Sequence, residues 1–207
     1  MEIERTFNTY NLKNCEIKSS ASTYKFYIPN INAATGIQKT SSSYWMKIWP
    51  SSVALADFIN KHHQIFKNKN IVELGAGIGL PSMAAARYAH SITCSDIEAD
   101  AVELMKLNFK DYPSISAAQI NWNHLPDNIS ADIWMMSDVN YDSSNFESLE
   151  KLFENILHKK SKIILSTPHR LAGRSFINHI IHRCSLKEDF EIEENEKITT
   201  VSVFMLE

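Results

Sequence analysis

The sequence predicts an α/β fold with a doubly wound, mostly parallel β-sheet. From Asn70 onward, short apolar runs of strand length alternate with segments whose apolar residues recur at helical spacing. A glycine-rich turn, Gly75–Gly79, follows the first of these runs and precedes a helical segment. Near the end of the chain, two apolar runs flank only the polar residues Glu193–Lys197. That spacing leaves no room for a helix and predicts an antiparallel hairpin.

The N-terminal part of the chain is expected to precede the main fold. Polar and aromatic residues alternate between Thr6 and Asn32, so residues 1–43 are interpreted as an extension with one or two short strands. The serine-rich stretch Thr40–Ser43 predicts a loop. The main domain then covers residues 44–207 and opens with a helix over Ser51–Phe66, where apolar residues follow a helical period.

The alternating part of the chain supplies the sheet and the helices that cover it. We expect strands at Asn70–Leu74, Ile92–Ser95, Ser114–Ile120, Ile133–Ser137 and Lys162–Ser166. We expect helices at Leu80–Ala89, Glu98–Phe109, Phe146–His158 and Arg174–Cys184. The terminal hairpin pairs Phe190–Ile192 with Ile198–Leu206. Because single helices connect successive strands, the crossovers should be right-handed and the strands parallel, with helices on both faces.

Composition and charge exclude several function classes. The 207 residues, 44% hydrophobic and 22% charged, suit one domain with a single core. A formal net charge of -3 argues against nucleic-acid binding. No segment predicts a membrane span or a targeting signal, and three scattered cysteines fit a reducing compartment, so we expect a cytoplasmic location. His179, His182 and Cys184 lack a paired cysteine or strand-end acid, so no metal site is expected.

The residues around the glycine turn indicate a nucleoside-containing ligand. Within Glu73–Pro81, three glycines permit a tight strand-to-helix turn and close backbone approach to a ligand. A dinucleotide fingerprint needs its third glycine where Leu80 stands, and a P-loop needs a lysine before serine or threonine, so neither pattern is met. Asp96 ends the next strand about 20 residues later, the spacing at which a carboxylate binds ribose hydroxyls. The alternative is a structural turn, with Asp96 as a helix cap.

The glycine turn also resembles a known motif. The segment Val72–Gly79 is similar to the first motif of class I S-adenosylmethionine methyltransferases. This resemblance implies a Rossmann-like methyltransferase fold, with a seven-stranded sheet that ends in an antiparallel hairpin, and S-adenosylmethionine as cofactor. It places Glu73 near the methionine part of the cofactor, together with Gly75 and Gly77. It places Asp96 at the ribose and Ile97 against the adenine.

Three further segments resemble the seven-strand protein lysine methyltransferases. They are Trp45–Pro50, Asn121–Trp122 and Asp138–Tyr141. The chain is most similar to the enzymes that methylate the β subunit of electron transfer flavoprotein, which implies a protein substrate. The resemblance makes Trp49 and Trp122 cofactor contacts; the alternatives are a staple for the first helix and a core tryptophan. The loop that contains Arg170 matches the subgroup's pattern imperfectly, which leaves the substrate open.

Asp138 and Tyr141 are the expected catalytic residues. A lysine amine is mostly charged at neutral pH, since its ordinary pKa is about 10.4, and it must become neutral to accept a methyl group. Asp138 at a strand end is expected to bind and orient the amine or help remove its proton, and Tyr141 to line the lysine channel. A turn residue and a loop aromatic are the alternatives. The resulting hypothesis is protein lysine N-methylation; a small-molecule N-methyltransferase and a non-catalytic module of the same fold remain open.

Overall fold

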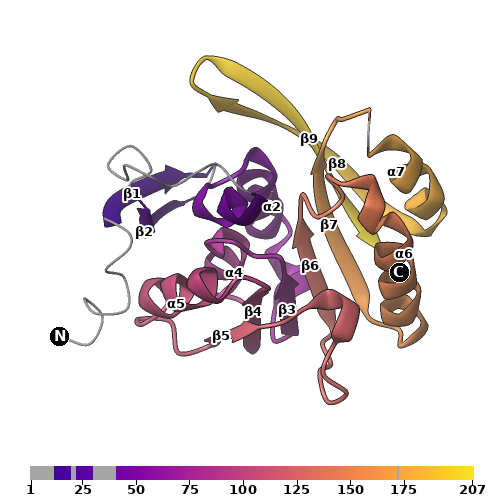
Figure 1. The fold of residues 1–207 in the computed structure, drawn as a ribbon, viewed down its shortest axis with the longest axis horizontal. Helices are drawn as coiled ribbons and strands as arrows, with labels where there is room; N and C mark the ends of the chain where they lie inside the picture. Colours follow the sequence, from indigo (N-terminus) through magenta and orange to yellow (C-terminus); the bar gives the residue numbers. More distant parts are fainter. Residues whose placement is uncertain (1–11, 20–21, 30–40, 172) are drawn as a thin grey trace.

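The structure, a computed structural model, describes residues 12–19, 22–29, 41–171 and 173–207. Its centre is a seven-stranded sheet with the strand order β5-β4-β3-β6-β7-β9-β8 (Figure 1). The strands are β3 (Asn70–Leu74), β4 (Ser91–Asp96), β5 (Ile115–Gln119), β6 (Ile133–Ser137), β7 (Lys162–Pro168), β8 (Cys184–Glu194) and β9 (Lys197–Leu206). Strands β3 to β7 pair in parallel, and β9 runs antiparallel to both β7 and β8. The predicted fold class is confirmed.

Helices cover both faces of this sheet. They are α2 (Pro50–Lys61), α3 (His63–Phe66), α4 (Leu80–Ala85), α5 (Ala99–Asn108), α6 (Phe146–His158) and α7 (Arg174–Ile180). Because side chains alternate along a strand, Ile71 packs into a core with α2, α4 and α5, whereas Val72 packs into a second core with α6 and α7. No helix within the described ranges is long and apolar enough to cross a membrane.

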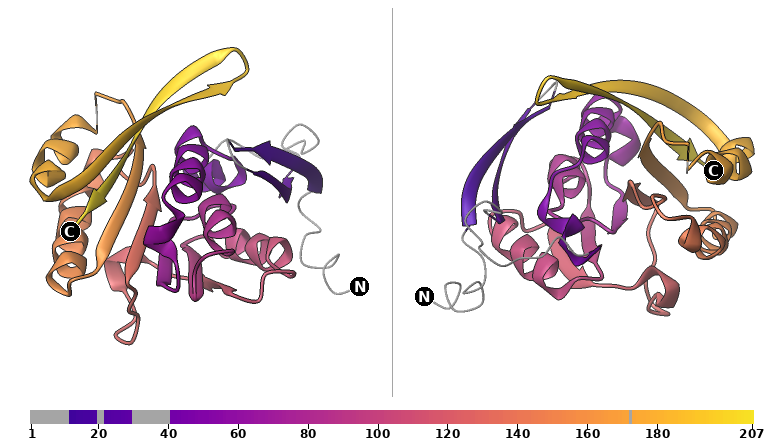
Figure 2. Two further views of the ribbon diagram at one scale, coloured as in Figure 1. Left: turned by 180° about the vertical axis from the view of Figure 1, so that it is seen from behind. Right: turned by 45° about the horizontal axis from the view of Figure 1, so that its top comes forward.

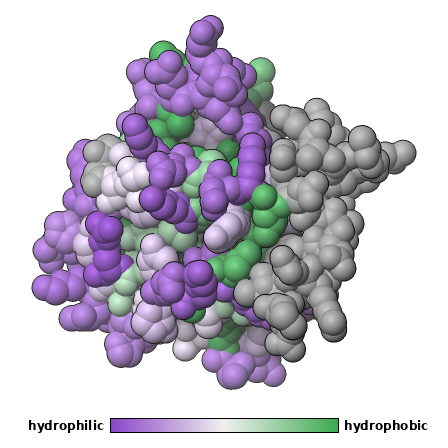
Figure 3. Space-filling view, turned by 90° about the vertical axis from the view of Figure 1, so that its left-hand side faces the viewer, coloured by the Kyte–Doolittle hydropathy of each residue, from purple (hydrophilic) through white to green (hydrophobic). Residues whose placement is uncertain are grey.

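A two-stranded antiparallel sheet lies outside the helices on one face. It pairs β1 (Leu12–Lys18) with β2 (Thr23–Pro29). Phe26 is buried in the same core as α2 and α4, and the backbone N–H of Tyr27 donates to Asn108 Oδ1 on α5 at 2.8 Å. Viewed from this side, the surface is mainly hydrophilic, with smaller hydrophobic strips (Figure 3). The rest of the expected extension, in residues 1–11 and 30–40, lies outside the described residues.

Several boundaries differ from the prediction. The first helix stops at Lys61, because His62 leaves helical geometry with ψ near 32° before the short α3 begins. Ser41–Met46 forms a 3-10 helix where a loop was expected over its first residues. The helix predicted to reach Cys184 stops at Ile180, followed by a 3-10 turn, Ile181–Arg183. The start of β8 was also missed, because its polar residues hide the period-two pattern, which is typical of a charged edge strand.

The strand order identifies the edge of the sheet at which a ligand is expected to bind. The chain moves outward from β3 to β5 in one direction and from β6 to β7 in the other, so β3 and β6 flank a topological switch point. Loops after the carboxyl ends of these strands diverge there and leave a crevice. The β8–β9 hairpin projects beyond the sheet and curves over α2 (Figure 2), against which both strands pack.

Candidate cofactor and acceptor site

A cavity of about 460 Å³ lies at the switch point. Sequence-predicted site residues that line it are Trp49, Gly75, Gly77, Asp96, Ile97, Trp122, Asp138 and Tyr141. Arg170, from the loop after β7, also lines it. Residues from six separate segments of the chain therefore meet in one cavity. Glu73 is the one predicted site residue outside this lining.

The glycine turn brings backbone up to the cavity wall. Gly75, Gly77 and Gly79 all have positive φ angles, between 56° and 81°. A Cβ atom on Gly77 would lie 3.3 Å from the carbonyl oxygen of Trp45, and one on Gly79 would lie 2.4 Å from Cζ of Phe109. A side chain at either position would therefore be strained by the backbone conformation, and at Gly79 it would also clash with Phe109. The predicted role of these glycines, a tight turn beside a ligand, agrees with this geometry.

Asp96 joins the end of β4 to the glycine turn. Its Oδ2 accepts a hydrogen bond from the backbone N–H of Gly77 at 2.8 Å, and its Oδ1 accepts one from that of Glu98 at 3.0 Å. The side chain is mostly buried, and burial raises the pKa of its carboxyl. Each carboxylate oxygen has a second lone pair, so both can still accept bonds from sugar hydroxyls. Asp96 thus combines the two expected roles, a turn-forming residue before α5 and a cavity residue.

Glu73 lies beneath the turn instead of in the cavity. Its side chain is fully buried, and Oε2 accepts a hydrogen bond from the backbone N–H of Ser82 at 2.9 Å as well as one from the Ser82 hydroxyl. Burial raises the pKa of its carboxyl to about 7. Glu73 therefore holds the first turn of α4 in place, and the cofactor contact expected from the resemblance stays a prediction.

Aromatic rings form one wall of the cavity. The Tyr44 ring lies 5.9 Å from that of Trp49 and 5.6 Å from that of Tyr141, centroid to centroid. Trp49 Nε1 donates to the Tyr44 carbonyl at 3.0 Å. On the opposite side, the Trp122 ring packs on the turn, since a Cβ on Gly75 would lie 3.2 Å from it. The sequence interpretation did not include Tyr44 as a site residue, although its position next to Trp45 was a usable signal.

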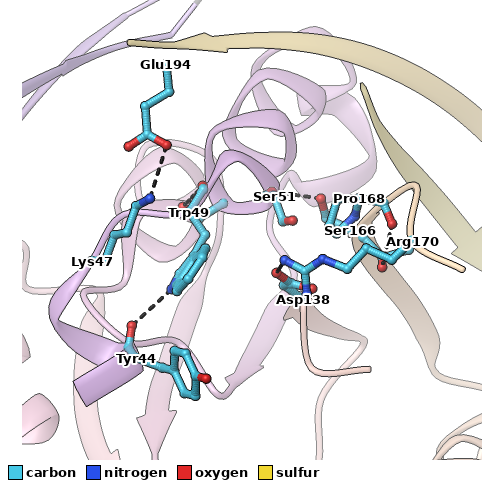
Figure 4. A network of polar contacts seen from close by, with 11 residues as sticks. Tyr44, Lys47, Trp49, Ser51, Asp138, Ser166, Pro168, Arg170 and Glu194 are labelled. Atoms are coloured by element: carbon cyan, nitrogen blue, oxygen red, sulfur yellow. Dashed lines mark hydrogen bonds and ion pairs between the residues drawn. The ribbon is translucent and has the colours of Figure 1, made fainter. Parts of the chain in front are cut away.

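Asp138 occupies a strained position at the end of β6. Its φ is 55°, in the left-handed region that residues other than glycine rarely adopt, and its backbone N–H donates to the Ser166 carbonyl at 2.7 Å. Its Oδ2 forms an ion pair with Arg170 at 2.8 Å (Figure 4). Burial raises the pKa of the carboxyl to about 6, although Arg170 acts in the opposite direction. Backbone strain and a shifted pKa together are typical of functional residues.

Polar atoms without partners cluster around Asp138. Among the described residues, the buried side-chain oxygen or nitrogen atoms that have no hydrogen-bond partner are Ser51 Oγ, Glu73 Oε1, Ser137 Oγ, Asp138 Oδ1 and both amide atoms of Asn140. Ser137 and Asp138 line the cavity, Asn140 follows Asp138 by two positions without lining it, and Ser51 lies in the first turn of α2. Buried polar groups are normally bonded, so a cluster of exceptions marks a place where a ligand or ordered water binds. No pattern in the sequence pointed to Ser51, Ser137 or Asn140.

His179 on α7 and His182 in the 3-10 turn that follows it each have a neighbour within the described residues. His179 Nε2 is 3.9 Å from a Glu150 carboxylate oxygen, and His182 Nδ1 lies 2.8 Å from the His179 carbonyl. Within the described part of the chain, no three His, Cys, Asp or Glu side chains gather as a metal would require.

The residues present fit S-adenosylmethionine. The glycine turn presents backbone without Cβ atoms, Asp96 supplies acceptor oxygens at the turn, and the exposed side chain of Ile97 offers an apolar surface. The cavity volume lies within the range of small-molecule sites. Unpartnered Ser137 Oγ and Asp138 Oδ1 lie at the other end, where the acceptor must approach. These features suit a cavity that binds a nucleoside at one end and a polar acceptor group at the other.

Comparison with known proteins supports the same conclusion. The sequence profile of a family described as lysine methyltransferase matches residues 34–183. Human "Histone-arginine methyltransferase METTL23" is 26% identical over 151 residues, which cover 69% of this chain and 80% of that protein. The rat protein of that name is 28% identical, with 58% of this chain and 57% of its own length covered. "Protein N-lysine methyltransferase METTL21A" of Xenopus tropicalis is 25% identical, with 58% and 59% covered. The chain thus spans less than two thirds of the rat and Xenopus relatives.

Solved structures show the fold. The Thermus thermophilus 16S rRNA N2 G1207 methyltransferase in complex with AdoMet and guanosine superposes with a TM-score of 0.62 at 13% identity, covering 95% of this chain and 50% of that one. The N-methyltransferase NodS of Bradyrhizobium japonicum in complex with S-adenosyl-L-homocysteine gives 0.58 at 12%, covering 81% and 93%. The chain belongs to the lysine methyltransferase family, and its sequence-based assignment as a class I S-adenosylmethionine-dependent methyltransferase is confirmed.

Proposed function

We propose that this protein transfers a methyl group from S-adenosylmethionine to the side-chain amine of a lysine in a protein substrate. The single observation that carries the proposal is Asp138, a buried and strained carboxylate at the acceptor end of the cofactor cavity. The family description favours lysine as the acceptor. The β subunit of electron transfer flavoprotein, expected from the sequence resemblance, stays one candidate substrate within this proposal.

Asp138 suits the needs of amine methylation. With a pKa of about 6, its carboxylate is ionised at neutral pH and can bind a lysine ammonium. After the ammonium loses its proton, a carboxylate oxygen can accept a hydrogen bond from the neutral amine and hold its lone pair in line with the methyl group. When bound, S-adenosylmethionine supplies that methyl group on a sulfonium sulfur, which leaves as a neutral thioether. Asp138 is therefore the residue that takes or relays the amine's proton.

The remaining cavity residues hold the reactants and exclude water. Asp96 and the N–H groups of the glycine turn supply polar contacts at the cofactor end. Tyr44, Trp49 and Tyr141 present aromatic faces at the acceptor end. Aromatic faces attract cationic groups, so they favour an ammonium that approaches Asp138. The arrangement orients an amine without requiring a covalent intermediate on the protein.

Arginine methylation is the second candidate. Two relatives are named histone-arginine methyltransferases. The guanidinium of Arg170 already binds Asp138 at 2.8 Å, so the surroundings of this carboxylate accommodate a guanidinium. A substrate arginine would make the same contact. The observation therefore favours arginine as the alternative acceptor.

Methyl transfer into a proteome tests the proposal. A lysate from host cells that lack this chain is incubated with the purified protein and S-adenosylmethionine that carries a deuterated methyl group, and an identical lysate without the protein is the control. Mass spectrometry should find the label on lysine side chains. Label on arginine alone would replace the proposal with its alternative. Label confined to small molecules would instead support a small-molecule methyltransferase, and cofactor binding without any transfer would support a non-catalytic module.

A further inference from the structure

A second hollow, of about 450 Å³, borders the cofactor cavity. The two share four lining residues: Lys47, Trp49, Asp138 and Arg170. The second hollow extends from there to the start of β9, where Lys197–Thr200 forms its outer wall. Asp138 and Arg170 therefore stand between the site of the cofactor and a separate entrance for another ligand.

The second hollow is lined by a buried hydroxyl group that is available to bind a ligand. Ser51 lines it, is 1% exposed, and its Oγ has no hydrogen-bond partner. Neighbouring Ser166 donates to the carbonyl of Ser51 at 2.7 Å and accepts, through its own carbonyl, the N–H of Asp138 (Figure 4). One small network thus fixes both the wall of the second hollow and the strained residue at its inner end.

Arg170 covers the inner end of the second hollow. Its side chain is 41% exposed, whereas that of Asp138 is 11% exposed, so a solvent-accessible guanidinium lies over a largely buried carboxylate. A cationic side chain that reaches Asp138 Oδ2 through this entrance must displace the guanidinium. Arg170 then needs another anion, because leaving a partly desolvated charge without a partner is costly.

The lining offers the displaced guanidinium no free carboxylate among the described residues. Besides Asp138, the acid that lines the second hollow is Glu194, and it is already paired with Lys47 at 3.1 Å (Figure 4). Lys197 adds a further positive charge at the outer wall and forms no ion pair with a described residue. This lining therefore has an excess of cations once Arg170 leaves Asp138, and an incoming carboxylate would balance it.

We propose that the second hollow is the docking site for the acceptor segment of the substrate, and that this segment carries an acidic residue close to the acceptor. The inference rests on the proposed function. On binding, the acceptor cation replaces Arg170 at Asp138, and the substrate's carboxylate takes over the guanidinium, with Lys197 nearby. An extended chain advances roughly 3.3 Å per residue, so the acid should lie within about two positions of the acceptor.

Two peptide libraries test the docking site. Each library has one fixed central residue, lysine in the first and arginine in the second, with randomised flanking positions free of other lysine or arginine at the outset. After incubation with S-adenosylmethionine, mass spectrometry should show Asp and Glu enriched about threefold to tenfold beside the methylated residue. Arg170→Gln should abolish this enrichment. Arg170→Glu, tested with flanking lysine and arginine admitted, should reverse the preference toward basic neighbours.

Matched controls separate docking from folding and from the reaction itself. Arg174→Gln changes an exposed arginine at the start of α7 that lines neither hollow, and it should retain the acidic preference. Calorimetry with S-adenosylhomocysteine should give affinities within about threefold of each other for all variants, as expected for residues outside the nucleoside end. Methylation without acidic enrichment, or enrichment that survives Arg170→Gln, would overturn the docking site.

The libraries also distinguish the two proposals. Methylation of the arginine library alone, with acidic enrichment, would contradict lysine as the acceptor and support the docking site. Methylation of the lysine library without a flanking preference would support lysine as the acceptor and contradict the docking site. If neither library is methylated although the cofactor binds, recognition of a short acceptor segment by the second hollow is wrong.

Discussion

The cofactor end and the acceptor end of the cavity differ in how they satisfy their polar groups. At the cofactor end, both carboxylate oxygens of Asp96 accept backbone N–H bonds, and the turn is formed by glycines with positive φ that have little space for a Cβ atom. At the acceptor end, Ser137 and Asp138 both have buried polar side-chain atoms without a partner. Apart from Glu73 Oε1, which lies beneath the turn, the first region has its polar groups satisfied in the free protein. The second becomes complete only when a substrate or ordered water arrives.

This difference indicates which part of the site is preformed for the cofactor and which part rearranges when the substrate binds. A preformed cradle binds the same cofactor in every cycle at little conformational cost. Strain at Asp138 and its unpartnered oxygen are costs that a substrate can relieve. We therefore expect substitutions at the acceptor end to reduce turnover and substitutions at the cofactor end to reduce affinity or stability.

The largest expected effect is the loss of turnover in Asp138→Asn. The neutral amide lacks the negative charge that attracts an ammonium and does not take a proton, so kcat should fall by about a hundredfold to ten-thousandfold. Affinity for S-adenosylhomocysteine, measured by calorimetry, should stay within about threefold, since the nucleoside contacts lie at the other end. Asp142→Asn is the matched control in the same loop, because Asp142 is exposed and lines neither hollow. Equal losses in both variants would contradict the comparison.

The next effect should appear at the cofactor end. Asp96→Asn removes the charge from the acceptor of the Gly77 and Glu98 N–H bonds and from the expected ribose contact. A charged hydrogen bond contributes about 1.5–3 kcal/mol, so the Kd for S-adenosylhomocysteine should rise by roughly tenfold to a hundredfold. Asp111→Asn, an exposed residue after α5, is the control. The comparison fails if Asp96→Asn lowers kcat while the Kd is unchanged.

These two residues also show how far the sequence could lead. Asp96 was predictable because a glycine turn, a strand end and a fixed spacing all describe one local strand-turn-helix unit. Asp138 was identified through a family resemblance. The sequence did not predict its strained backbone or its ion pair with Arg170. The two members of this ion pair are 32 positions apart, and their contact depends on the parallel pairing of β6 with β7. Such contacts follow from topology, which a local pattern does not encode.

The same distinction between local patterns and tertiary contacts explains how well the sequence predicted the fold. Strands β3, β4 and β6 are mostly buried, and the sequence predicted them almost to the residue. Strand β8 starts six positions before its predicted limit, at Cys184, because its charged residues face solvent at the sheet edge. Ser51 gives a further example: it lies in the first turn of α2, and no sequence pattern reveals that it lines a hollow formed with β7 and β9. Edges and cavities are tertiary features, so local patterns do not reveal them.

A smaller effect concerns the exception at the cofactor end, Glu73. Its pKa is about 7 in the folded protein, against an ordinary value of 4.5, so the folded state holds its proton more tightly than the unfolded chain does. The associated stability is present below pH 4.5 and is lost as the pH rises through about 7, by an amount on the order of 3 kcal/mol. In Glu73→Gln this loss disappears.

Urea denaturation at pH 5 and pH 8 measures the Glu73 effect. The free energy of unfolding of the unmodified protein, relative to that of Glu73→Gln, should fall between the two pH values. The comparison between variants cancels the contributions of exposed carboxylates, whose titration is common to both. Glu103→Gln, which removes a partly exposed carboxylate of α5 that pairs with Lys106, is the control substitution. A constant difference between the protein and Glu73→Gln would show that Glu73 is ionised in the fold at both pH values.

The smallest effect should come from Arg170→Gln at the acceptor end. Arg170 opposes the upward shift of the Asp138 pKa, which lies at about 6, so its removal should raise that pKa further. Asp138 acts as an ionised group, and a higher pKa leaves less of it ionised at low pH. The acidic limb of kcat/KM, measured with the lysine peptide that the protein methylates fastest, should therefore move to higher pH.

Normalising each profile to its value at pH 8 separates this shift from any change in docking. Relative to pH 8, the activity of Arg170→Gln at pH 6 should be roughly threefold lower than that of the unmodified protein. Arg174→Gln should reproduce the unmodified profile. If the limb of Arg170→Gln coincides with that of the unmodified protein, the group that titrates is not Asp138 paired with Arg170. The proposed contrast between the cofactor end and the acceptor end would then depend on a residue other than this pair.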